Sequence, residues 1–256
     1  MILTQTPSPA HVLSAEIAAP DAQKLAAYAA SDAVLLLSCT VGRMLCKAGA
    51  QCYVLCSGTC AVLPQKLRQN DLYFPTNRFQ GVLLCMPHAV LPDAVPQVFR
   101  MTPALSACFA DTSNCSALPE LLAEAMPADE CRFAATQYRY ARAAYRELSG
   151  SLNRHIPIET LARQGQISPT HLKNSFRLVY GDSLYAYVRT QKMLAAAELL
   201  VQSSRTVLDI AGEFGYDNGS KFAKAFQTVL GVSPRQFRSA PSLPPESIRH
   251  ERRAIA

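Results

Sequence analysis

Hydrophobic and polar positions follow different rhythms in the two halves of the chain. Between residues 33 and 86, short apolar or alternating runs are separated by Gly42, Gly49, Gly58 and Pro64. A period of two residues is typical of strands, and glycine and proline mark the turns between them. Several strands at such close spacing predict a small antiparallel barrel or sandwich. The expected strands are AVLLLS, RMLCK, QCYVLC, TCAVL and GVLLCM.

After the strands, apolar residues recur every three or four positions, which is the period of a helix with one buried face. We expect helices over residues 118–126 and about 131–150, joining the strands to a helical part. The run SLYAYVRTQKMLAAAELLVQSS, residues 183–204, contains no glycine or proline. It predicts one helix of about twenty residues, or about 30 Å. Its buried positions are expected to be Met193, Ala196, Ala197 and Leu200.

The helical part contains an internal repeat. Each copy has a short helix, a break, a capped second helix and a glycine stop. The offset is 49 residues up to the cap and 50 after it, which places one extra residue just after the second cap. The matching positions are Leu161-Ala162 with Ile210-Ala211, Ser168 with Asp217, Phe176 with Phe226, Gly181 with Gly231, and Ser183 with Ser233.

In the first copy, Ser168 is expected to cap a helix that has Pro169 in its first turn and ends at Gly181. The buried stripe is expected at Leu172, Ser175, Phe176 and Val179. The polar residues of the same helix are Thr170, His171, Lys173, Asn174 and Arg177.

In the second copy, Asp217 is expected to be the cap and Gly231 the stop. The buried stripe is expected at Phe222, Ala225, Phe226 and Val229. The outward residues are Ser220, Lys221 and Lys224, together with Gln227.

Each copy therefore predicts a helix-turn-helix, whose second helix enters the major groove of DNA. Lysine and arginine contact phosphates and guanine, asparagine pairs with adenine, and serine or threonine contacts either. One copy alone is equally typical of any helical domain. Two copies on a rod of about 30 Å match the spacing of successive major-groove faces, about 34 Å.

The distribution of charge agrees with this interpretation. The formal net charge is +6, and residues 151–256 hold all of it, with 14 Lys and Arg against 8 Asp and Glu. Residues 1–150 carry 11 of each and are neutral. A basic module joined to a neutral one favours a polyanionic partner for the basic one, although a cationic surface alone would give the same numbers.

The run from Ile158 to Arg238 resembles the DNA-binding domain of the AraC/XylS transcription regulators, and the similarity covers about residues 140–238. It is carried by Ile210-Ala211, Phe214-Gly215-Tyr216, Phe222, Phe226 and Gly231-Val232-Ser233-Pro234. The resemblance implies a DNA-binding regulator, expected to be an activator, that works with RNA polymerase and binds two adjacent major-groove segments.

Three positions depart from the family's usual pattern. Gly165-Gln166-Ile167 replaces an apolar residue followed by glycine, which is expected to loosen the first helix pair. Lys192 stands where the family usually has arginine, so a bidentate contact is lost while the charge remains. Gly219 has no side chain to offer at the start of the second recognition helix. This helix is therefore expected to contact mainly the DNA backbone, through Lys221 and Lys224.

The N-terminal part is similar to the β-rich, cupin-like domains of many AraC-type regulators, through Gly42-Arg43, Phe74-Pro75 and Gly81. Such domains bind a small effector, form homodimers, or do both. Tyr53, Tyr73, Arg43 and Arg78 are either lining residues of an effector pocket or ordinary surface residues. Only His11 and His88 precede residue 132, which argues against a metal-binding cupin site. The sequence also contains no catalytic motif. We therefore expect neither enzymatic activity nor a cofactor.

All nine cysteines precede residue 132. Cys52, Cys56 and Cys60 are spaced by four, which differs from the paired C-x₂-C knuckles of zinc sites. Buried cysteine packs as a small hydrophobe, and this is the favoured interpretation. The alternatives are a thiol or soft-metal sensor and an alkyl-accepting cysteine, for which DNA binding would only deliver the chemistry.

The predicted fold class is α+β multidomain, a cupin-like barrel followed by an all-α domain with two helix-turn-helix units joined by a long helix. The predicted domains are residues 1–130 for sensing or dimerisation, 131–150 as connecting helix, 151–238 for DNA binding, and 239–256 as a disordered basic tail containing Arg249, Arg252 and Arg253. With neither a signal peptide nor an apolar span, the chain is expected in the cytoplasm, at the nucleoid.

Overall fold

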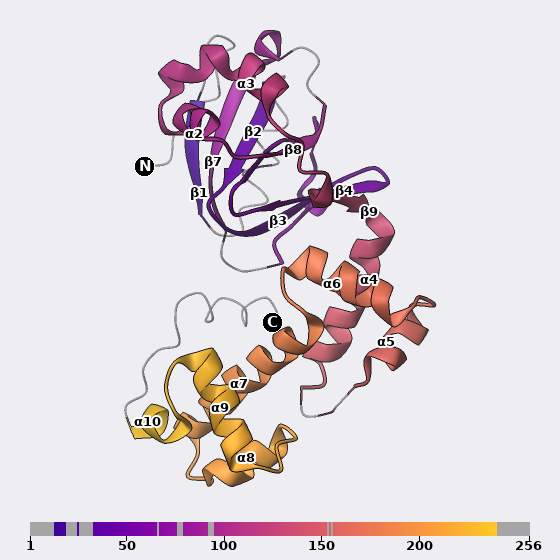
Figure 1. Ribbon diagram of the computed structural model, residues 1–256, viewed down its shortest axis with the longest axis vertical. Helices are drawn as coiled ribbons and strands as arrows, with labels where there is room; N and C mark the ends of the chain where they lie inside the picture. The colour runs from indigo at the N-terminus through magenta and orange to yellow at the C-terminus, as the bar shows by residue number, and fades with distance from the viewer. Residues whose placement is uncertain are drawn as a thin grey trace. The chain divides into compact units, whose positions relative to one another are not determined.

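The computed structural model describes residues 13–18, 25, 33–65, 67–75, 79–91, 95–152, 154 and 156–239. The chain forms two compact units, Met1–Ala135 and Thr136–Ala256 (Figure 1). His11, Arg78 and residues 240–256 of the predicted tail lie outside the described residues, whereas Ser239, expected to begin the disordered tail, is helical. No helix in the described ranges is both long enough and apolar enough to cross a membrane.

The N-terminal unit is built on a single bent sheet, which in the described part of the chain has nine strands. The main path runs β8-β5-β2-β7-β3-β4-β9, and every pairing is antiparallel. β1 pairs with the other edge of β7, and β6 pairs with β3, so the sheet approaches a closed barrel. The strands are β1 Leu13–Ala18, β2 Ala33–Cys39, β3 Val41–Ala48, β4 Gln51–Cys56, β5 Thr59–Val62, β6 Leu72–Tyr73, β7 Phe79–Pro87, β8 Gln97–Arg100 and β9 Arg132–Ala134.

A bend between β2 and β3 allows both strands to pair with the same edge of β7. Ser38 lies at this bend, where its hydroxyl donates to the Val82 carbonyl at 3.2 Å and accepts from the Val82 amide at 3.0 Å. The Ser38 carbonyl oxygen lies only 1.9 Å from where a Cβ on Gly81 would be. Glycine is therefore required at position 81.

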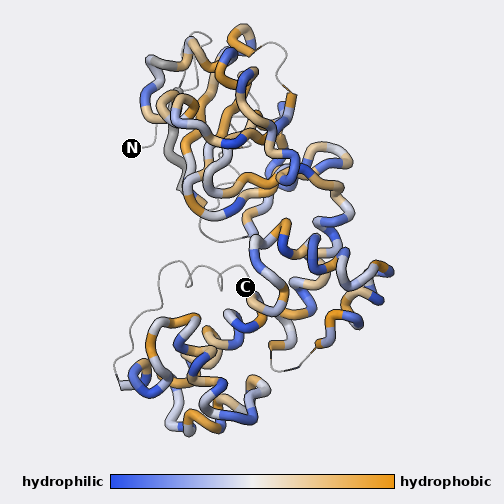
Figure 2. The backbone as a smooth tube through the Cα atoms, in the orientation of Figure 1, coloured by the Kyte–Doolittle hydropathy of each residue, from blue (hydrophilic) through white to orange (hydrophobic). Residues whose placement is uncertain are grey.

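Two helices cover one end of the sheet and complete its core. They are α2 Pro103–Ala110, capped by the Thr102 hydroxyl, and α3 Leu118–Glu124. Their buried side chains pack with those of β2, β5, β7 and β8. Apolar stretches follow the strands, whereas apolar and polar stretches alternate along the helices of the second unit (Figure 2). The core includes Leu36, Leu84, Phe99, Leu105 and Leu118.

The connecting helix starts later than expected. Residues 131–134 were expected to be helical, but Arg132–Ala134 form β9, which pairs with β4, and the helix α4 is Ala135–Ser149. Ladder hydrogen bonds to β4 outweigh the helical preference of this short segment. The strands predicted between residues 33 and 86 are confirmed, and the helix expected over 118–126 is confirmed as α3.

The second unit is all helical and confirms the predicted fold class. Its helices after α4 are α5 Ile158–Gln164, α6 Pro169–Tyr180, α7 Leu184–Gln202, α8 Val207–Glu213, α9 Gly219–Leu230 and α10 Pro234–Ser239. α7 is the predicted long helix, and all four of its expected core residues are buried. It runs from the α5–α6 pair to the α8–α9 pair (Figure 1).

An aromatic cluster joins α4 to the first helix pair. The rings of Tyr145 and Tyr180 are stacked with centroids 4.9 Å apart, and Tyr145 also contacts Tyr187 of α7. Phe176 of α6 contacts Tyr180 at 4.6 Å. Such pairs contribute about 0.5–1.5 kcal/mol each beyond burial. α4 is thus part of the core of the second unit.

Candidate nucleic-acid interface

The first candidate recognition helix, α6, is held at both ends as the sequence predicts. The Ser168 hydroxyl accepts a hydrogen bond from the His171 amide at 3.2 Å, and Gly181 ends the helix with φ of 81°. The four residues of the predicted stripe are all buried. The five predicted DNA-binding side chains are exposed: Thr170, His171, Lys173, Asn174 and Arg177.

The second candidate recognition helix, α9, has a different cap from the predicted one. The side-chain oxygen of Asn218, not that of Asp217, accepts from the amides of Ser220 and Lys221 at 2.8 and 3.2 Å. Asp217 is wrong as the cap because the α8–α9 turn uses one more residue before the helix begins. Phe222 and Phe226 are buried, whereas Ala225 and Val229 are half-buried. Gly231 ends the helix with φ of 79°.

The corrected cap also changes the alignment of the two copies, because the extra residue now precedes the cap. With Ser168 equivalent to Asn218, every outward position of α9 has a counterpart in α6. Gln227 takes the place of Arg177; it was expected to face outward but was not among the predicted DNA-binding residues. The equivalent exposed pairs are Thr170 with Ser220, His171 with Lys221, Asn174 with Lys224, and Arg177 with Gln227.

The turns within the two helix pairs share one backbone geometry. The Ile167 amide donates to the Ala162 carbonyl, and the Tyr216 amide donates to the Ala211 carbonyl, both at 3.0 Å. The expected loosening of the first turn is absent from this hydrogen-bond pattern. The first turn has Gln166 where the second turn has Gly215. Both residues adopt a left-handed backbone conformation, with φ of 54° and 80°, so the two turns keep the same shape despite this difference in sequence.

Lys192 ties the long helix to the second turn. Its Nζ donates to the Phe214 carbonyl at 2.8 Å, at the C-terminal end of α8. Burial lowers the pKa of the Lys192 ammonium group. A cation at a helix C-terminus is stabilising, so Lys192 has a structural role here that its sequence position alone did not indicate.

The electrostatics of both recognition helices favour an anion. Neither α6 nor α9 contains an acidic residue. Among the described residues, the ion pairs of the second unit do not involve Lys173, Arg177, Lys221 or Lys224. Their charges are therefore free of acidic competitors for phosphate.

His171 differs from the other exposed residues of α6 because it also packs within the protein. Its ring lies edge-on to Tyr140 of α4, with centroids 5.8 Å apart. This contact restricts the orientation of the imidazole. The contact with Tyr140 of α4 therefore helps to fix the position of the His171 side chain.

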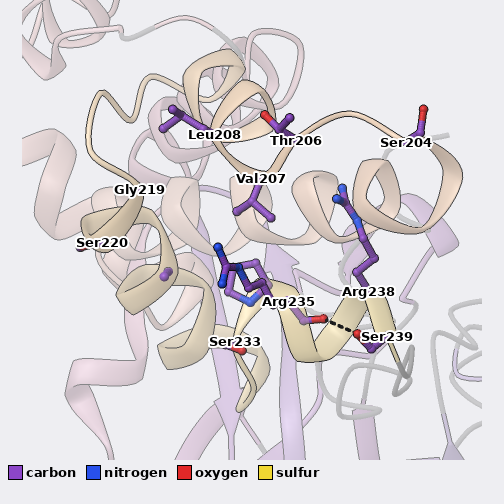
Figure 3. A pocket seen from close by; sticks show the side chains of 12 residues that line it. Ser204, Thr206, Val207, Leu208, Gly219, Ser220, Ser233, Arg235, Arg238 and Ser239 are labelled. Atoms are coloured by element: carbon purple, nitrogen blue, oxygen red, sulfur yellow. Dashed lines mark hydrogen bonds between the residues drawn. The ribbon is translucent and has the colours of Figure 1, made fainter.

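Beside α9, a groove of about 850 Å³ is lined by the first turns of α8, α9 and α10 (Figure 3). Ser220 and the exposed Arg235 lie on its walls. Arg238 is engaged in the fold, since its guanidinium donates to the carbonyls of Leu200 and Arg205 at 3.2 and 2.6 Å. Ser220 thus faces both a cationic groove and the outer side of α9.

In the N-terminal unit, Arg43, Tyr53 and Tyr73 are half-buried on three strands. A groove of about 600 Å³ lies elsewhere, and none of these residues lines it. Its lining is largely apolar: Val62, Val90, Leu91, Val95, Gln97, Phe99, Pro119, Leu122, Ala123, Ala125 and Pro127.

The cysteines occupy the core of this unit. All nine are free thiols, and eight are buried; Cys56 alone is half-buried. Burial raises the pKa of most of them, to about 12 for Cys60. Within the described ranges, no three side chains of the His, Cys, Asp or Glu type gather where they could hold a metal ion.

Two helix-turn-helix pairs on a common long helix, with exposed cationic second helices, define a class of DNA-binding proteins. Residues 161–240 match the family model described as "Helix-turn-helix domain". The chain is 31% identical over 91 residues to the transcriptional activator AarP of Providencia stuartii, covering 36% of this chain and 67% of AarP. It is 32% identical over 92 residues to the probable transcription factor PqrA of Proteus vulgaris, covering 36% and 75%.

Among solved structures, the C-terminal domain of AraT from Geobacillus stearothermophilus is 28% identical, with a TM-score of 0.38, over 42% of this chain and 88% of that one. The DNA-binding domain of AdpA in complex with a target DNA is 27% identical, with a TM-score of 0.37, over 39% and 90%. The assignment rests on the sequence matches. This chain belongs to the AraC family of DNA-binding transcription regulators.

Proposed function

We propose that the protein is a sequence-specific transcription activator that inserts α6 and α9 into two successive major-groove segments of one DNA duplex. The observation that supports this most directly is the exposure of equivalent polar positions on both helices, in a unit that holds all the net positive charge. Activation is favoured because AarP is described as a transcriptional activator.

The two helices are proposed to differ in their tasks. α6 carries most of the base recognition through Lys173, Asn174 and Arg177, with Thr170 and His171, because its side chains include those that form bidentate contacts with guanine and adenine. α9 carries Ser220, Lys221 and Lys224, which suit phosphate contacts better. α6 would thus set specificity, and α9 would mainly add affinity.

Single substitutions test this division. Arg177→Ala or Asn174→Ala should weaken binding to the cognate site by about 1–3 kcal/mol and relax discrimination at one base position. Lys224→Ala should weaken all duplexes alike and reduce the slope of log K against log[salt] by about 1. Affinities are measured on the cognate site and on random DNA over a range of salt. Equal losses on both DNAs for Arg177→Ala and Asn174→Ala would refute the assignment of base recognition to α6.

The remaining parts of the proposal concern partners and location. The N-terminal unit would receive a signal, form a homodimer or do both, and the DNA-bound protein would recruit RNA polymerase. Binding to chromosomal DNA would put its action in the cytoplasm, at the nucleoid. Membership of the family and the presence of a separate N-terminal unit support these parts of the proposal.

A further inference from the structure

Cys56 and Cys131 are brought together by the fold although 75 positions separate them in the sequence. Cys56 ends β4, and Cys131 lies immediately before β9, the strand that pairs with β4. Their side chains are in hydrogen-bond contact, with the Cys131 thiol donating to the Cys56 sulfur. Among the nine cysteines, this pair includes the one residue that is only half-buried.

The surroundings of Cys56 favour its thiolate. The hydrogen bond from Cys131 and the nearby Arg43 guanidinium outweigh burial and lower the pKa of Cys56 to about 6. Arg43 is the cross-strand partner of Cys56 in β3. Thiols with such a pKa are about nine-tenths ionised at pH 7, and the thiolate is the nucleophile.

The other groups near Cys56 have a smaller influence or are engaged elsewhere. Glu130 opposes ionisation of Cys56 but forms an ion pair with Arg100 at 2.5 Å. The Cys39 thiol donates to the Val41 and Gly42 carbonyls at 3.5 and 3.6 Å, and burial raises its pKa to about 12. The Cys39 thiol is thus engaged with backbone carbonyls, whereas the Cys131 thiol, whose pKa is also raised, is hydrogen-bonded to Cys56.

We propose that Cys56 and Cys131 form a hydroperoxide-reactive pair, and that the disulfide between them is the signal that the N-terminal unit receives. This inference rests on the proposed function for its signalling part, whereas the chemistry of the pair stands by itself. No assigned DNA-binding residue takes part in it.

The reaction balances as an ordinary two-electron thiol oxidation. The Cys56 thiolate attacks one oxygen of hydrogen peroxide, the O–O bond breaks, and the leaving hydroxide takes up a proton to become water, which leaves Cys56 as a sulfenic acid. The Cys131 sulfur then attacks that sulfur, the S–O bond breaks, and a second water leaves with the Cys131 proton. Two thiols become one disulfide, and a thiol reductant reverses the change.

The location of Cys131 connects this chemistry to the DNA-binding unit through the chain itself. Cys131 is followed by β9 and then by α4, whose Tyr145 packs in the aromatic cluster with α6. A covalent bond to β4 would restrict the segment that enters α4. Coupling between sites is typically 5–150-fold in affinity, so we expect oxidation to change DNA affinity by roughly fivefold or more.

The test treats the reduced full-length protein with equimolar hydrogen peroxide and maps its disulfides by mass spectrometry under non-reducing conditions. A peptide pair joined through Cys56 and Cys131 is expected in the wild type and in the control Cys39→Ala, and is expected to be lost in Cys56→Ser and in Cys131→Ala. Cys56 remaining a thiol, or a bond from Cys56 to Cys39 instead, would overturn the assignment of the pair.

Two further measurements separate the parts of the proposal. Alkylation of Cys56 by iodoacetamide should fall to half near pH 6, and the midpoint should move towards about 8.5 in Cys131→Ala, where the donor is gone; an unchanged midpoint would contradict the thiol pair. DNA affinity is compared between reduced and oxidised wild type. A disulfide that leaves the affinity unchanged would overturn the signalling role alone, and a reduced protein that prefers no DNA sequence would overturn the proposed function instead.

Discussion

Gln166 and Gly215 occupy the same left-handed position in the turns of the two helix pairs, with φ of 54° and 80°. Glycine adopts this conformation without cost, whereas another residue loses roughly 1–2 kcal/mol there. The space around both positions is open enough for the exchange: Gln166 is exposed, and a Cβ on Gly215 would meet only the Lys192 ammonium at 3.8 Å. The two turns thus share one backbone geometry, and the first turn is strained because its left-handed residue is not glycine.

Exchanging the two residue types should move stability in opposite directions. Gln166→Gly is expected to raise the free energy of unfolding by about 0.5–1 kcal/mol, and Gly215→Gln to lower it by about 1–2 kcal/mol. Denaturant unfolding of the full chain, followed by helical circular dichroism, measures both. A Gly215→Gln variant as stable as the wild type would contradict the strain at this position.

The start of α9 shows how far sequence patterns determine an element. Asp217 and Asn218 are both good caps, so the residue types alone do not choose between them. The choice depends on how many residues the turn after α8 needs. The hydrogen bonds of the Asn218 side chain to the first turn show that the turn takes the longer form.

Removing each side chain in turn distinguishes the two candidate caps. Asn218→Ala should lower stability by about 1 kcal/mol because two helix amides lose their acceptor. Asp217→Ala, the matched control one residue earlier, should stay within about 0.5 kcal/mol of the wild type. The same unfolding measurement applies. A larger loss for Asp217→Ala than for Asn218→Ala would restore the cap expected from the sequence.

Helices and strands with a clear period were predictable from the sequence, and others were not. The buried stripe of α6 and the core positions of α7 follow directly from helical spacing. β9 has only three residues, too few for a period to show, and its strand form depends on pairing with β4. α2 did carry a signal, Thr102 followed by Pro103, which is typical of a helix start.

Contacts between elements that are far apart in the sequence could not be predicted from local patterns. The spacing of Cys52, Cys56 and Cys60 drew attention to neighbours along the chain, yet the partner of Cys56 is Cys131, which the β4–β9 pairing brings close. Similarly, Tyr140 supports His171 from a helix that was expected only to connect the two parts. Contacts of this kind depend on tertiary structure and leave no local pattern.

For the whole molecule, the division of labour between two units was visible in the sequence because charge and cysteine are distributed so unevenly. The N-terminal unit, with 8 Lys and Arg against 10 Asp and Glu, holds all nine cysteines, and the basic second unit holds the two helix-turn-helix pairs. α7, with 19 residues, is about 28 Å long at 1.5 Å per residue. A rigid helix of this length suits two recognition helices placed one turn of DNA apart.

Hydroxyl-radical footprinting of the reduced full-length protein on its selected DNA site tests this spacing most directly. We predict that each chain protects two segments about 10 base pairs apart on one face of the duplex, and that a homodimer protects two such pairs. Protection of a single segment per chain, or of two segments on opposite faces of the duplex, would contradict the account.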